Sequence, residues 1–461
     1  MGPGWPQRVH AVPDSTTAIA SPATNAKKPR ETHAIGIESP FAAAAVRTSG
    51  RRIVRSGKDE TMVSKLGVRD VVAAVAEAAR RWNDINFTLR RKAIRVIAER
   101  TGYAAYVVET AIDRLFVPLT ADAIESTIVG ELGSLQILDD FVTREGLGRV
   151  RALPIGRVCV VSSRTTIGVA LVPAIFALCA GCEVLVKDRE DGLIAAFFET
   201  LYEVLPSLAH RAAAIAWQGS RDIVDIGAFD SVVAFGTDET LATVARGLPL
   251  HTRFIPHGSR VSAGYVAVNA LNDEVYATTI AAGAAADALL YDGEGCMSLH
   301  VLFLESGGRL SPAAFAKLLR DEFAETAQRY SASAVPGTTA RTALQRDEAL
   351  LHSTNLFSDE RASYLLVAGS PNGSPPLFAP RTTNLVTVEH PQQAAEYLRR
   401  HGLAVETLAV SGAGCDYADL ARGCGAARIT TFGSMQSPPP GSPHGGRPRI
   451  AEFVRWIVDE T

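Results

Sequence analysis

The chain has 461 residues, too many for one ordinary hydrophobic core, which predicts two or three domains. Hydrophobic residues make up 47% and charged residues 21%, a composition typical of a soluble globular protein. The formal net charge of -3 gives no electrostatic reason to expect a nucleic acid or an anionic membrane as partner.

Residues 1–64 are rich in Pro, Ala, Ser, Thr and Arg and show no sustained apolar period, which predicts a disordered extension. The segment lacks the apolar core of a secretory signal, while a transit peptide and a translation start at Met62 both stay open. Helices are expected after it. Apolar residues recur at helix spacing from Val68, and further helices are predicted at 90–99, 103–115 and from Thr120 to about Leu138.

Strands and helices alternate from Leu153 onward, a pattern typical of a doubly wound parallel sheet with its ligand crevice at the carboxyl ends of the strands. Residues 167–186 are almost wholly apolar, but a parallel sheet covered on both faces explains this run better than a membrane span, because it contains Pro173, Gly181 and Glu183. The strands are predicted at 158–161, 184–186, 213–217, 231–235 and 252–255, and the helices at 171–179, 193–205 and 240–248.

A second α/β unit is predicted from about Tyr265. A loop is expected at 370–380, where Pro, Asn, Gly and Ser gather. The strands of this unit are predicted at 265–268, 299–304 and 384–388, and its helices at 273–289 and 312–330.

The six cysteines are scattered, whereas a secreted disulfide scaffold is short and rich in cysteine, so a reducing cytoplasm is favoured. Cys179 and Cys182 have the spacing of a redox motif but end an apolar run, and we interpret them as buried structural thiols. No second pair completes a zinc site, and no metal site is predicted.

Cys296 lies in the segment Asp-Gly-Glu-Gly-Cys-Met-Ser (292–298), between a predicted helix and a buried strand. Glycines at 293 and 295 allow a close backbone approach and positive φ angles, and neighbouring N–H groups can receive an oxyanion. A thiolate is a strong nucleophile, and its exchange with a thioester is nearly balanced in free energy. On spacing alone, an inert buried cysteine is the commoner outcome.

Two common motifs are absent. No Gly-x-Gly-x-x-Gly follows a predicted strand, so the usual dinucleotide fingerprint is not supported. Gly-x-Ser-x-Gly is also absent, which argues against a serine hydrolase.

Short blocks of sequence, in order from about Leu66 to the C-terminus, point to one known family. The block at 428–439 is the most specific, because its order and spacing are unusual. The blocks lie at 101–103, 115–120, 131–133, 156–158, 180–187, 233–239, 258–262, 296–298, 428–439 and 444–447. With these blocks the chain resembles the acyl-CoA reductases, the fatty acid reductases of the bacterial luminescence type, a branch of the aldehyde dehydrogenase superfamily.

The resemblance implies an aldehyde-dehydrogenase-like α/β fold and an enzyme that passes the acyl group of acyl-CoA or an acyl-protein to Cys296. Hydride from NADPH or NADH then reduces the acyl-cysteine to an aldehyde. A homo-oligomer or a complex with an acyl-transfer enzyme also fits the resemblance. It further implies an N-terminal helical region (65–150), a nucleotide-binding domain (151–264), a catalytic domain (265–430) and a C-terminal segment (431–461) that returns to the domain interface.

The superfamily holds its cofactor without the usual fingerprint. Lys187, at a strand end, is placed to reach the adenosine ribose, although a solvent-exposed lysine is also common there. Glu190 would favour NADH by binding a ribose hydroxyl, whereas Arg189 would favour NADPH by meeting a 2′-phosphate. Gly236 and Thr237 end a strand where phosphate or nicotinamide is usually bound, but helix capping explains Thr237 equally well.

Oxidising aldehyde dehydrogenases carry a glutamate in the segment that corresponds to 256–260, and this chain has none there. His257 is the nearest titratable group and is the predicted base, although a loop histidine is more often a surface residue. Without that glutamate, water is activated poorly and the acyl-enzyme survives for reduction, which favours a reductase over an oxidising dehydrogenase.

Two departures from the family pattern concern the site. Thr165 stands where the family has an asparagine as oxyanion donor, and loss of one such donor costs roughly 10²–10³ in rate. Gly445 replaces the acid of the family's His-Asp-Gly-Arg motif. The alternative is therefore a catalytically weakened homologue that binds an acyl thioester or a partner enzyme.

Overall fold

The computed structural model of the protein describes residues 66–461, except 164, 189–191, 217–225, 333–342, 345–346, 348–350, 352–355 and 413–416. The predicted extension at 1–64 lies outside the described residues, as do Arg189 and Glu190.

The described chain begins with helices α2 (Val68–Trp82), α3 (Thr88–Thr101), α4 (Ala105–Phe116), α5 (Ala121–Leu132) and α6 (Gln136–Asp139). The apolar face of α2 ends at the fully buried Trp82, whose indole donates to Thr200 Oγ1 of α8 (Leu193–Val204) at 3.0 Å. The prediction of one helix from Thr120 to Leu138 is wrong. Helix α5 stops at Leu132, because Gly133 takes the left-handed conformation (φ 85°) that ends helices.

The predicted doubly wound parallel sheet is confirmed. It has five strands in the order β5-β4-β3-β6-β7, all parallel. Helix α7 (Leu171–Cys179) and part of β4 account for the long apolar run, and no helix among the described residues is long and apolar enough to cross a membrane. The strand order reverses between β3 and β6, so ligands are expected beyond the carboxyl ends of these two strands. The strands are β3 (Arg157–Val161), β4 (Glu183–Asp188), β5 (Ala212–Ala216), β6 (Ser231–Phe235) and β7 (Arg253–His257).

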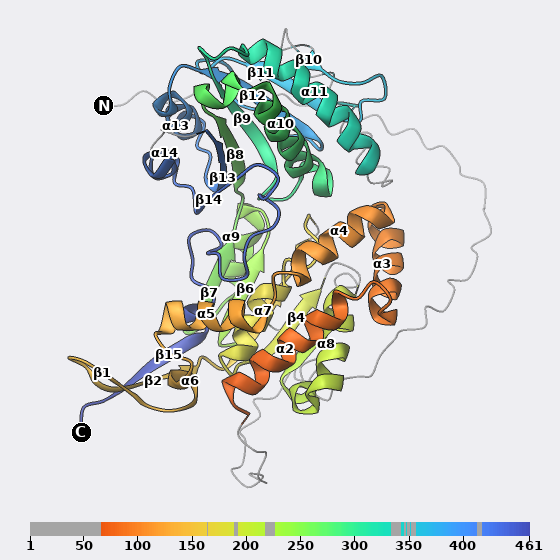
Figure 1. The fold of residues 1–461 in the computed structure, drawn as a ribbon. Coiled ribbons are helices and arrows are strands. Elements are labelled where there is room, and N and C mark those ends of the chain that lie inside the picture. The colour runs from red at the N-terminus through yellow and green to blue at the C-terminus, as the bar shows by residue number, and fades with distance from the viewer. Residues whose placement is uncertain are drawn as a thin grey trace, which may run out of the picture. The chain divides into compact units, whose positions relative to one another are not determined.

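A second sheet has seven strands in the order β10-β11-β12-β9-β8-β13-β14, parallel except for β10 against β11. Helices α10 (Glu274–Leu289) and α11 (Pro312–Arg329) pack on one face, and α13 (Pro391–Arg400) and α14 (Tyr417–Cys424) on the other (Figure 1). The strands are β8 (Val261–Val266), β9 (Leu299–Glu305), β10 (Leu356–Phe357), β11 (Leu365–Gly369), β12 (Thr382–Val388), β13 (Val405–Ser411) and β14 (Arg428–Thr430). Strand β8 begins four residues before the predicted start at Tyr265, and residues 268–272 form a 3₁₀ turn.

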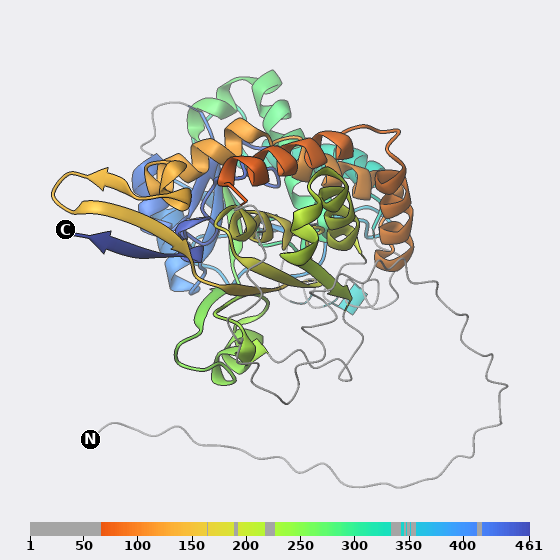
Figure 2. The ribbon, with the colours of Figure 1, turned by 90° about the horizontal axis from the view of Figure 1, so that it is seen from below.

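The third sheet joins the last strand of the chain to two strands that precede the five-stranded sheet. Strands β1 (Val142–Arg144), β2 (Gly148–Pro154) and β15 (Val454–Asp459) are antiparallel, with β2 in the centre. These strands, gold and dark blue in Figure 2, extend away from the rest of the described chain. To reach β2, the C-terminal segment passes elements of both larger sheets. Gly433 N donates to Asp287 of α10 at 2.6 Å, and Arg253 of β7 donates to Glu452 O at 2.6 Å.

Candidate active site

The segment before Cys296 has an unusual backbone. Tyr291, Asp292 and Gly293 all have left-handed φ angles, of 58°, 56° and 71°. The positive φ predicted for Gly293 is confirmed, and a Cβ there would come within 2.8 Å of Ala288 O. The same prediction for Gly295 is wrong, because its φ is not positive. Gly295 instead leaves room for the side chain of Thr166, because a Cβ at position 295 would lie only 3.1 Å from Thr166 Oγ1.

Buried contacts hold this turn. The carboxylate of Asp292 pairs with Arg381 at 3.0 Å, with both side chains 3% exposed, and Arg381 N donates to Asp292 O at 2.6 Å. On the other side, Ser262 Oγ donates to Cys296 O at 2.7 Å and accepts from Thr407 N at 3.0 Å. The position of Cys296 is therefore set by elements of the seven-stranded sheet.

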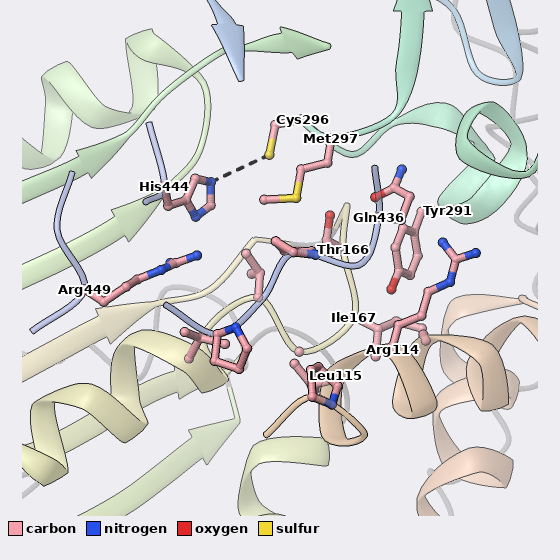
Figure 3. A pocket seen from close by; sticks show the side chains of 17 residues that line it. Arg114, Leu115, Thr166, Ile167, Tyr291, Cys296, Met297, Gln436, His444 and Arg449 are labelled. Carbon is pink, nitrogen blue, oxygen red and sulfur yellow. Dashed lines mark hydrogen bonds between the residues drawn. The ribbon is translucent and has the colours of Figure 1, made fainter. Parts of the chain in front are cut away.

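Cys296 differs from the other described cysteines. It is partly exposed, whereas Cys159, Cys179, Cys182 and Cys424 are buried, which confirms the interpretation of the 179/182 pair. Its Sγ lies 3.8 Å from His444 Nε2 (Figure 3). Burial raises the pKa of the Cys296 thiol to about 12, with a further contribution from the charge of Glu406, while the backbone N–H groups of Cys296 and Met297 act in the opposite direction.

His257, the predicted base, lies behind His444. The two imidazoles stack with ring centroids 4.4 Å apart, and Phe235 stacks on His257 at 4.7 Å. Burial lowers the pKa of His257 to about 3, with help from the charge of Arg449. It is His444 that contacts the thiol. From the sequence we did not predict a role for His444, although it stands in the block at 444–447.

A buried carboxylate approaches the same imidazole. Glu406 Oε1 lies 4.0 Å from His444 Nε2, and its oxygens accept from Gly445 N at 2.9 and 3.1 Å. Burial raises the pKa of Glu406, and Arg260 lies 3.6 Å away. Gly445 has a φ of 62°, which glycine adopts freely. A carboxylate from β13 thus lies beside His444 although the acid expected at position 445 is missing.

Cys296 lies where two pockets meet, together with Thr166, Val169 and His444. The first, called the apolar pocket below, contains about 750 Å³ of empty space, part of which is open to solvent. The second, the polar pocket, contains about 1130 Å³ of such space and lies at the carboxyl ends of β6 and β7. Apolar side chains lining the first pocket include Leu115, Pro118, Ile167, Val172, Met297, Pro438 and Pro440.

The polar pocket contains most of the other predicted residues. Gly236, Thr237, His257 and Thr165 line it. The hydroxyl of Thr237 also caps α9 (Asp238–Arg246) by accepting from Thr240 N at 3.3 Å, so the capping interpretation is supported.

Thr165, Lys187 and Glu294 differ in their positions relative to the two pockets. Thr165 is exposed, with its hydroxyl 3.3 Å from Ser163 Oγ, whereas the neighbouring Thr166 lines both pockets. Lys187 is buried at the end of β4 and lines neither pocket. Glu294, which we did not consider from the sequence, lines the polar pocket two residues before the thiol.

No group of three or more His, Cys, Asp or Glu able to hold a metal ion occurs in the described parts of the chain.

Comparisons with known proteins identify the family and the fold of this chain. Residues 63–456 match the family model of acyl-CoA reductase (LuxC). A search of curated proteins finds no match. Solved structures with the same fold include a NAD-dependent benzaldehyde dehydrogenase from Corynebacterium glutamicum, with 14% identity, a TM-score of 0.62 and 86% of each chain covered.

Two other structures agree. The NADP-dependent glyceraldehyde-3-phosphate dehydrogenase from Bacillus halodurans, complexed with NADP, has 14% identity and a TM-score of 0.62, covering 86% of this chain and 87% of that one. A mutant of aldehyde dehydrogenase C from Pseudomonas syringae, complexed with NAD+ and octanal, has 13% identity and a TM-score of 0.64, covering 85% and 84%. These likenesses confirm the predicted aldehyde-dehydrogenase-like fold.

Proposed function

The chain belongs to the LuxC family of acyl-CoA reductases, and we propose that it reduces an acyl-CoA or acyl-protein thioester to an aldehyde through an acyl group carried on Cys296. The observation that carries this proposal is the position of the thiol between an apolar and a polar pocket. The apolar lining of the first pocket suits an acyl chain, and the polar lining of the second suits a nucleotide cofactor. The thiol is then accessible to both.

At neutral pH the resting site holds an uncharged thiol and an uncharged imidazole. The pKa of Cys296 is raised to about 12, and burial lowers the pKa of His444 well below its ordinary value. Proton transfer is therefore coupled to attack on the thioester rather than completed beforehand. We propose that His444 takes this proton, because its Nε2 is 3.8 Å from Sγ, and that His257 supports it by stacking.

Glu406 would stabilise the imidazolium that forms during attack, since its carboxylate is 4.0 Å from the same nitrogen. As Sγ bonds to the carbonyl carbon, the C–S bond of the carrier breaks, and His444 returns its proton to the departing thiolate. The products of this step are the acyl-cysteine and the free carrier thiol. The carbonyl oxygen would receive hydrogen bonds from backbone N–H groups of the turn and from the hydroxyl of Thr166 or Thr165.

The residues of the polar pocket fit a nicotinamide cofactor. The pocket lies beside the switch point of the five-stranded sheet, at the carboxyl ends of β6 and β7, where open α/β sheets bind nucleotides. Ser259, which lines the pocket, is held by its N–H, which donates to Asp238 Oδ1 at 2.9 Å. Gly236 and Thr237, which line this pocket, would hold the cofactor there. When bound, a nicotinamide cofactor supplies the hydride that, with one proton from solvent, converts the acyl-cysteine to aldehyde and free thiol.

Mass spectrometry tests the proposal directly. Mixing the protein with a fatty acyl-CoA should add one acyl mass to Cys296, and NADH or NADPH should remove it with release of aldehyde. The variant Cys296→Ala should not be labelled, while Cys424→Ala, which removes a thiol of α14, should behave as wild type.

Two other results are informative. A mass that never changes would contradict the proposal. An adduct that forms but resists both cofactors would favour the catalytically weakened homologue. Comparing NADH with NADPH in the same assay identifies the cofactor.

A further inference from the structure

The apolar pocket contains a cation with no hydrogen-bond or ion-pair partner among the described residues. Arg114, in the last turn of α4, lines this pocket. Its Nη1 is buried without a hydrogen bond, and its guanidinium forms no hydrogen bond or ion pair with any described residue. An unpaired buried donor of this kind costs free energy unless a ligand pairs with it.

Neighbouring groups do not supply that partner. Arg114 interacts electrostatically with Asp287 and Tyr330 but forms no hydrogen bond with either side chain. The two oxygens of Asp287 accept instead from Gly433 N at 2.6 Å and Met435 N at 3.1 Å. The second arginine of the pocket, Arg449, is different, because its Nε donates to Ser442 O and its charge interacts with Glu406. Arg114 is thus the arginine of this pocket that has no hydrogen-bond acceptor among the described residues.

Arg114 and Cys296 lie on opposite sides of the pocket in Figure 3. The remaining walls are mainly apolar, including Leu115, Ile167 and Met297. A molecule that fills this space would therefore have a reactive carbonyl at one end, methylene groups in the middle and an anionic group at the other end. Guanidinium binds a carboxylate through paired, charge-assisted hydrogen bonds.

We propose that Arg114 binds a carboxylate at the far end of the acyl chain, so that the preferred substrates are monothioesters of dicarboxylic acids rather than plain fatty acyl thioesters. This assignment rests on the proposed function for the identity of the reacting end. The charge of Arg114 selects the substrate and takes no part in bond breaking.

A binding measurement that needs no catalysis is the first test. Calorimetry should show hexanoate binding to the wild type about 10- to 100-fold more tightly than hexanamide, which has the same size and no charge. Arg114→Gln should abolish the preference, Arg114→Lys should keep part of it, and Arg95→Gln, an exposed position on α3, should leave it intact. Equal affinities in the wild type would overturn the proposal even if the protein proves to be a reductase.

Kinetic comparison separates the acyl chain from the carrier, whose phosphates are a second source of anions. With both CoA and N-acetylcysteamine as carriers, adipoyl thioesters should be reduced with higher kcat/KM than hexanoyl thioesters, and Arg114→Gln should reverse the order. N-acetylcysteamine has no phosphate. If Arg114→Gln instead slows both CoA thioesters equally and neither N-acetylcysteamine thioester, Arg114 binds the carrier phosphate and the assignment to the acyl chain is wrong.

Discussion

The thiol of Cys296 and the imidazole of His444 lie 3.8 Å apart, although 148 residues separate them along the chain. Burial opposes a charge on both groups, since it raises the pKa of the thiol and lowers that of the histidine. The pair is therefore suited to transfer a proton during attack and not to form a stable thiolate–imidazolium pair. This distinguishes it from the thiolates of highly reactive cysteines.

The first prediction separates the two stacked histidines. His444→Gln should slow acylation of Cys296 by acyl-CoA about 100-fold or more, the usual contribution of a general base. His257→Gln should cause a smaller loss, because this ring acts only by supporting His444. Rapid mixing followed by mass spectrometry measures both rates. A larger effect from His257→Gln would restore His257 as the base.

The second prediction concerns pH. Because burial raises the pKa of Cys296 to about 12, the thiolate fraction should increase with pH throughout the range from about 7 to 10. Alkylation of Cys296 by iodoacetamide should then accelerate about tenfold per pH unit. Peptide mapping of the labelled protein identifies the site. A rate that levels off below about pH 9 would show a preformed thiolate and contradict this description.

The third prediction gives Glu406 opposite effects in two assays. Its charge raises the pKa of Cys296, so Glu406→Gln should increase the rate of alkylation at a fixed, mildly alkaline pH. The same change removes the carboxylate beside His444, so acyl transfer should become slower. A purely structural role would change both rates in the same direction, and that result would exclude Glu406 as a positioning residue for His444.

The fourth prediction concerns the buried pair that holds the nucleophile's turn. Removing one member of such a pair leaves an unpaired buried charge, so Asp292→Asn or Arg381→Met should each lower the free energy of unfolding by about 3–5 kcal/mol. Asparagine tolerates the left-handed φ of position 292, so that change tests the charge and not the backbone. The double variant should lose less than the sum of the two. Urea denaturation measures all three, and strict additivity would show that the pair does not interact.

The agreement between sequence and structure is best where the chain is buried on all sides. Helix α7 and strand β6 have their predicted bounds, because continuous apolar runs of these lengths fit only covered elements of a parallel sheet. Strands β2 and β15 were not predicted, since they are half exposed and pair across 300 residues or so of chain that no local pattern connects.

The residues of the candidate site also differ in how far the sequence alone predicts them. Cys296 was predicted because a short local segment and a family resemblance both indicate it. His444 comes from a loop without periodicity, and only the fold brings its ring to the thiol. Glu406 is buried in β13, where no motif marks it.

The last prediction uses two adjacent threonines. From the sequence we expected Thr165 as oxyanion donor, yet its hydroxyl is exposed and lies 3.3 Å from Ser163 Oγ. Thr166 is close to the turn, because a Cβ on Gly295 would lie 3.1 Å from its hydroxyl oxygen, and it lines both pockets with Cys296.

Thr166→Val should therefore slow acylation by roughly 10²-fold, the cost of one lost donor. Thr165→Val preserves shape in the same manner and should have little effect. Both variants keep the thiol, so unchanged iodoacetamide labelling of Cys296 controls for folding. If Thr165→Val slows acylation more, the donor is the residue expected from the family alignment, and its side chain must turn toward Cys296 when substrate binds.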